Sequence, residues 1–144
     1  MRHALLITAA ITIAQASSSF ASGGMSCRGE SETVRFEVAS GITRGMGAPL
    51  FQLTGTLQGE LEAIDADISN LTYEMDDVAQ WWLDGDQLNL LLYVEREGEP
   101  LGSTELTIKT QSVDEGSYQG RFDLLSYDDG VLAEATGKVR CMVE

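Results

Sequence analysis

Apolar and polar residues alternate with a period of two along much of this chain. Alternation of this kind predicts β-strands that bury one face in a core. It is found in five stretches: 34–38, 51–57, 106–108, 118–124 and 135–143. The segment 88–94 is apolar on both faces and is therefore expected to be a central strand. We expect one core that includes six of these side chains: Phe36, Leu90, Leu92, Ile108, Phe122 and Val139.

Turn signals stand between the alternating segments. Acidic residues beside glycine, which adopts positive φ at little cost, favour tight hairpin turns. Four such sites follow one another: Asp84-Gly85-Asp86, Glu97-Gly98-Glu99-Pro100, Asp114-Glu115-Gly116 and Asp128-Asp129-Gly130. From Trp81 onward the chain is therefore predicted to be a series of antiparallel hairpins. Earlier in the chain we expect a loop at 41–49 and one or two irregular strands within 59–75.

These patterns predict an all-β fold with seven or eight short strands and very little helix. Consecutive hairpins form an antiparallel meander, and a meander of this length closes into a small barrel, with a β-sandwich as the alternative. The residues 22–144 are enough for a single domain of either type.

The first 21 residues have the features of a signal peptide. Arg2 supplies a positive charge, and the uncharged run 4–14 has the length of a signal-peptide apolar region. Small residues allow cleavage after Ala16 or after Ala21, and the second site leaves the more usual polar segment before it. We therefore expect residues 1–21 to be removed, and the protein to be periplasmic or secreted with no membrane insertion afterwards.

Two cysteines, Cys27 and Cys141, lie near the ends of the predicted domain. An exported protein meets an oxidising compartment, where such a pair forms a disulfide. A disulfide requires Cα atoms within about 7 Å. The terminal strands are therefore predicted to be neighbours, which favours the barrel.

The composition limits the chemistry available to this chain. The net charge is −14, or about −15 once Arg2 is removed, and the acidic residues are spread along the chain. Such a charge repels nucleic acid and anionic lipid and favours cationic partners. The single histidine, His3, lies in the predicted signal peptide, so histidine-based catalytic and zinc sites are not expected. We expect no enzymatic activity, no cofactor and no metal; a glycan hydrolase that uses a pair of carboxylates is the enzymatic alternative.

One acidic stretch resembles a calcium-binding loop. Asp65, Asp67, Ser69 and Asp76 have the spacing of EF-hand ligands, but Asn70 occupies the position that requires glycine. The flanking segments also lack a helical pattern, so we expect no calcium site there.

The segment 76–86 is the most unusual local feature. Two adjacent tryptophans lie between two pairs of carboxylates in the sequence. The candidate partner-binding site consists of these six residues: Asp76, Asp77, Trp81, Trp82, Asp84 and Asp86. In a strand the two indoles would point to opposite faces, so that one enters the core and the other meets solvent. In a short helix they would share one face. An exposed indole beside carboxylates can bind an ammonium or guanidinium group, or stack on a sugar.

The outline of the chain is similar to that of bacterial periplasmic lysozyme-inhibitor barrels: exported, acidic, small, all-β and disulfide-linked. The resemblance implies an inhibitor-like role, but the Ser-Gly-x-x-Tyr type of inhibitory loop has no match, because Ser40-Gly41-Ile42-Thr43 is followed by Arg44. The predicted function is therefore binding, to a cationic protein or peptide. A barrel that holds an apolar ligand is the non-enzymatic alternative.

Overall fold

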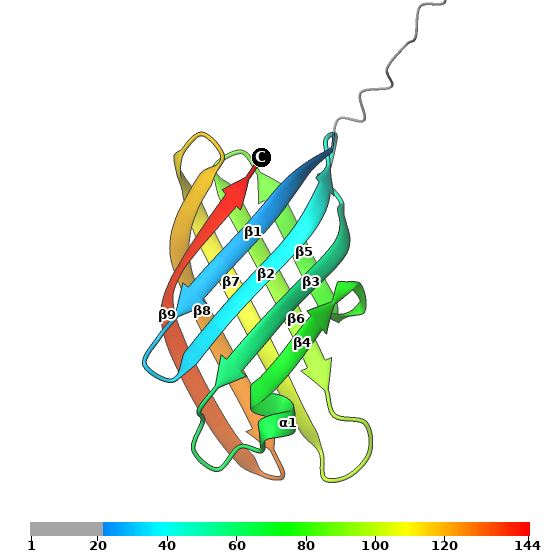
Figure 1. Ribbon diagram of the computed structural model, residues 1–144, viewed down its shortest axis with the longest axis vertical. Coiled ribbons are helices and arrows are strands. Elements are labelled where there is room, and N and C mark those ends of the chain that lie inside the picture. Colours follow the sequence, from blue (N-terminus) through cyan, green and yellow to red (C-terminus); the bar gives the residue numbers. More distant parts are fainter. Residues whose placement is uncertain (1–21) are drawn as a thin grey trace, which may run out of the picture.

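The computed structural model describes residues 22–144, so the predicted signal peptide lies outside the described residues. The chain forms nine antiparallel strands in one sheet that curls into a nearly closed barrel (Figure 1). The strands are β1 (Ser22–Glu30), β2 (Val34–Thr43), β3 (Leu50–Gly59), β4 (Asn70–Glu74), β5 (Val78–Asp84), β6 (Gln87–Glu95), β7 (Gly102–Asp114), β8 (Ser117–Asp128) and β9 (Val131–Val143). The helix α1 (Ala66–Ser69) precedes β4, and the 3-10 turn η1 (Met75–Asp77) follows it. Neither is long or apolar enough to cross a membrane.

The order of strands around the sheet is β4-β3-β2-β1-β9-β8-β7-β6-β5. Strands adjacent in sequence pair with each other, except β4 and β5, and the first strand pairs with the last, as predicted. The two free edges, β4 and β5, are therefore adjacent in sequence and are joined by η1 rather than by a ladder of hydrogen bonds. The seam of the barrel lies in the middle of the chain, and the paired terminal strands lie at the centre of the sheet.

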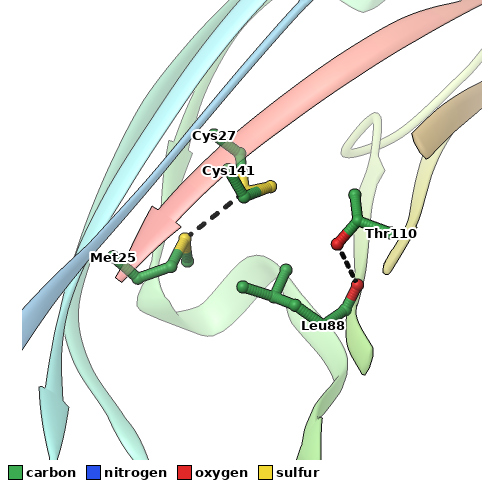
Figure 2. Close-up of a disulfide and its surroundings, with 5 residues drawn as sticks. All are labelled: Met25, Cys27, Leu88, Thr110 and Cys141. Carbon is green, nitrogen blue, oxygen red and sulfur yellow. Dashed lines mark hydrogen bonds between the residues drawn. A yellow bond between two sulfur atoms is a disulfide. The ribbon is translucent and has the colours of Figure 1, made fainter. Parts of the chain in front are cut away.

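The Cys27–Cys141 disulfide joins β1 to β9, which confirms the prediction (Figure 2). The two residues stand directly opposite each other, with Cα atoms 4.1 Å apart. This is the close spacing of an antiparallel pair that shares no backbone hydrogen bonds. The disulfide faces the interior, where the thioether sulfur of Met25 lies 3.5 Å from Cys27 Sγ. Covalent closure therefore occurs inside the core.

Side chains fill the barrel. All six predicted core residues are buried in a single cluster, together with inward-facing residues from β3 and β4. The rings of Phe36 and Phe122 meet edge to face, with centroids 5.0 Å apart. They fit because Gly29 and Gly137 lie next to them: a Cβ at Gly29 would stand 2.2 Å from Phe36 Cε1, and one at Gly137 would stand 2.6 Å from Phe122 Cε1. The small residues on β1 and β9 thus leave room for the largest residues of the core.

The fold departs from the sequence patterns mainly in its first half. There are nine strands rather than seven or eight, because β1 and β4 gave weak signals. β1 begins with small residues that hardly alternate, and β4 is only five residues long. The loop predicted at 41–49 is shorter, since β2 continues to Thr43. The irregular stretch 59–75 contains one strand and the single turn of α1.

Candidate functional site

β5 carries the predicted tryptophan pair as an extended strand. Trp81 points inward, packs against the core and donates a hydrogen bond from Nε1 to the carbonyl oxygen of Ala48 at 2.8 Å. Trp82 points outward, with 57% of its surface exposed. The strand alternative is therefore the one observed, and Trp82 is the indole that a partner can reach.

The four carboxylates of the predicted site are divided between the two ends of β5. Asp76 and Asp77 lie in η1, before the strand, whereas Asp84 ends it and Asp86 follows in the next turn. At about 3.3 Å per residue, Asp77 and Asp84 are roughly 23 Å apart along the strand. Asp77 is also engaged, because its Oδ2 accepts the backbone N–H of Glu74 at 2.7 Å. The structure keeps Trp82, Asp84 and Asp86 together and leaves Asp76 and Asp77 outside this group.

A second hairpin adds two carboxylates that the sequence analysis missed. The β5–β6 turn packs against the β7–β8 turn: the backbone N–H of Ser112 donates to Asp86 O at 2.7 Å, and the Tyr118 hydroxyl donates to Gly85 O at 3.3 Å. Both turns lie at the end of the barrel that is uppermost in Figure 1. Four exposed carboxylates meet there, and we call this group the acidic end: Asp84, Asp86, Asp114 and Glu115.

None of the four is ion-paired within residues 22–144. Trp82 borders the acidic end, because it stands two residues before Asp84 on the same outward face of β5. The signal that could have revealed Asp114 and Glu115 is the meander itself, in which alternate turns fall at the same end of the sheet.

The opposite end of the barrel is held by one arginine. Arg96 binds Asp67 through two hydrogen bonds of 2.8 Å and Asp128 through one of 2.9 Å, and Asp65 lies 3.6 Å away. Only 12% of the Arg96 side chain and 6% of the Asp128 side chain are exposed. Asp65 and Asp67, which share the spacing of calcium ligands, therefore stand around a guanidinium. The cluster ties α1 and the turns after β6 and β8 into one cap.

Hydrogen bonds from Arg96 hold the pKa of Asp67 and of Asp128 below the usual aspartate value. A lowered folded-state pKa stabilises the fold above the unfolded value of about 4, and that stability is lost as the pH falls through the folded value. We therefore expect Arg96→Gln to lower the melting temperature by several degrees at pH 7. The difference from the unmodified protein should be constant above about pH 5 and should shrink steadily below about pH 4. Thermal unfolding followed by circular dichroism between pH 2 and pH 8 measures this.

Arg44→Gln, which changes an exposed arginine outside this cluster, is the control and should leave the melting temperature nearly unchanged. A difference between Arg96→Gln and the unmodified protein that does not change down to pH 2 would show that the cluster contributes packing and not charge.

The interior offers a ligand little room. Large apolar side chains occupy it, and the Tyr73 hydroxyl is the one buried side-chain polar atom without a hydrogen-bond partner in the described part of the chain. Burial raises the pKa of Tyr73 above its ordinary range, and the nearby Asp77 carboxylate adds to this. Across residues 22–144, no three histidine, cysteine or acidic side chains converge as a metal site. The reachable chemistry of this barrel is on its outer surface.

Comparison with known proteins does not add a relative to this picture. No family model, curated protein or solved structure matches this chain.

Proposed function

We propose that this chain is an exported binding protein, without catalytic activity, that captures a cationic protein or peptide at the acidic end of its barrel. The observation that carries the proposal is the meeting of two hairpins there, which brings four exposed, unpaired carboxylates together beside the exposed indole of Trp82. The disulfide supports an oxidising, extracellular-type location. The filled interior supports binding at the outer surface rather than enclosure of an apolar ligand.

The acidic end has two ways to hold a lysine or arginine. The carboxylates attract the charge and accept its N–H groups, and a guanidinium forms two parallel bonds to one carboxylate. The face of an exposed indole attracts the same cation through its π-electrons. The net charge of the protein, −14, adds a long-range field that speeds the encounter with a basic partner.

A nona-arginine peptide tests this proposal by titration calorimetry at low and moderate salt. The variant Asp84→Asn/Asp86→Asn/Asp114→Asn/Glu115→Gln keeps the shape of the acidic end and removes its charge. We expect it to weaken binding by about tenfold or more, since each exposed pair contributes modestly and four act together. Binding to the unmodified protein should also weaken as salt rises, because exposed charges are screened over about 8–10 Å.

A matched variant removes four exposed carboxylates from the other end of the barrel: Glu32→Gln, Glu60→Gln, Glu62→Gln and Glu97→Gln. It changes the net charge equally and should retain most of the affinity. Equal losses in the two variants would mean that the peptide responds only to net charge and that the acidic end is not a site.

A further inference from the structure

The basic residues of this acidic protein are gathered on one side of the barrel. Residues scattered from position 28 to position 140 meet there because β2, β1, β9, β8 and β7 are consecutive in the sheet. The group contains six of the nine Lys and Arg residues in the chain: Arg28, Arg35, Lys109, Arg121, Lys138 and Arg140. All six are exposed and point outward.

The pairing of the strands places like charges directly opposite each other. Lys109 faces Arg121, and Arg121 faces Lys138 on the next strand. Arg28 likewise faces Arg140 across the terminal strands. Like charges in this arrangement destabilise a sheet. The chain has 23 acidic residues from which to build opposite-charge pairs, so stability does not account for three basic pairs.

Four of the cations form no ion pair within the described residues; Glu30 faces Lys138 across β1 and β9 but is bound to Arg35. Arg28 is paired with Glu37, and Arg35 is paired with Glu30. The other four form no ion pair within residues 22–144. We call them the cation quartet: Lys109, Arg121, Lys138 and Arg140. Arg121 donates a hydrogen bond to Thr136 Oγ1 at 3.0 Å, and Asp123 is the acidic residue that stands nearest to it on the outward face of β8. The quartet is therefore open to an anion from outside.

Side-chain amides lie beside the quartet. A hollow on the outer wall between β6 and β8 is lined by Lys109 and Arg121, by the carboxylate of Asp123 at its edge, and by four amide residues: Gln87, Asn89, Gln111 and Gln119. Gln87, Gln111 and Gln119 stand opposite one another on successive strands, and Arg140 continues their row. None of the four amides makes a side-chain hydrogen bond to another described residue. Each amide offers two donors and one acceptor oxygen to a ligand.

Glu30 and Asp123 are the carboxylates beside the quartet, so the four cations still outnumber them, and the acidic end is too far away to cancel the remaining charge. Lys109 stands five residues before Asp114 on β7, which is about 17 Å along an extended strand. Charges are screened over roughly 8 Å at physiological ionic strength. A short anion at the middle of the wall is therefore attracted by the quartet, whereas a long polyanion would also meet the carboxylates at both ends.

We propose that this wall, formed by the cation quartet and the four amides on β6–β9, binds a short acidic oligosaccharide. The cations hold its acid groups, and the amides donate to and accept from its hydroxyls. Two other partners fit less well. A peptide cannot extend the sheet here, because β7, β8 and β9 are paired on both sides. A lipid surface would find no apolar groove among the residues that line the hollow.

Calorimetric titration with hexagalacturonate tests the proposal. The variant Lys109→Gln/Arg121→Gln/Lys138→Gln/Arg140→Gln should weaken binding by tenfold or more. Its melting temperature should not fall, because the substitution removes like-charge pairs. A second variant, Gln111→Ala/Gln119→Ala, should weaken binding about threefold while leaving the charge unchanged. A third, Thr54→Glu/Gln58→Glu/Thr72→Glu/Gln80→Glu, changes the net charge as the quartet variant does, but on β3, β4 and β5, and should bind as the unmodified protein does.

Further probes separate this proposal from its competitors and from the proposed function. Maltohexaose, which is neutral, should not bind. Equally strong binding of hexaglutamate, binding of anionic phospholipid vesicles alone, or an unchanged affinity in the quartet variant would overturn the proposal. The variant Asp84→Asn/Asp86→Asn/Asp114→Asn/Glu115→Gln should bind hexagalacturonate with the affinity of the unmodified protein. The two sites are therefore tested independently, and a failure of one does not imply a failure of the other.

Discussion

Replacing both cysteines, as in Cys27→Ala/Cys141→Ala, should lower the free energy of unfolding by about 4–5 kcal/mol, the largest loss that we expect from any change in this chain. The disulfide joins residues 114 positions apart, so it restricts the unfolded chain over almost the whole domain. In the folded state the substitution removes only the two buried sulfur atoms, which lie beside Met25. Urea denaturation at equilibrium measures the difference.

The reduced, unmodified protein serves as the control for that variant. It should unfold at nearly the same urea concentration as the alanine variant, and a reductant should have no effect on the variant itself. A decrease in the free energy of unfolding of less than about 1 kcal/mol would contradict this expectation. It would show that the paired terminal strands hold the barrel closed without the covalent bond.

The second large effect is expected from Leu90→Ala, which should cost about 2–5 kcal/mol. Leu90 is 1% exposed and stands between Trp81 on β5 and Ile108 on β7. Its truncation would leave a cavity in the part of the wall that supports both the seam strand and the outward-facing Trp82. Thermal and urea denaturation measure the change.

Leu132→Ala provides the matched comparison, because Leu132 is 58% exposed on β9. Removing the same atoms there should change the free energy of unfolding by less than about 0.5 kcal/mol. Similar losses at the two positions would mean that the interior is not the packed core described above.

Much of this fold follows from local patterns. Period-two alternation predicts the later strands, and the acidic-glycine turns predict the hairpins that follow Trp81. Cysteine placement predicts the pairing of the first and last strands, because a disulfide requires close backbones. The patterns fail where alternation is weak, as in the small residues of β1 and the five residues of β4, whose positions are set by their neighbours in the sheet.

The candidate sites were less accessible from sequence for a different reason. Closeness in the chain suggested that Asp77 and Asp84 would act together, but an extended strand separates them, one at each end of β5. The cation quartet was not predicted, because its members are distant in sequence. Lys109 and Lys138 are brought near each other only by the pairing of β7 and β9 with β8. Which outward residues are neighbours depends on the register, which the alternation alone leaves open.

We propose above that a cationic partner is captured at the acidic end. Two-dimensional amide NMR of the protein during titration with the nona-arginine peptide tests this capture most directly. We predict that chemical-shift changes will be confined to the β5–β6 and β7–β8 turns, at residues 82–86 and 112–118, and to the indole N–H of Trp82. Changes centred on α1 and the β6–β7 turn at the other end, or on the core residues, or no changes at all, would contradict the claim.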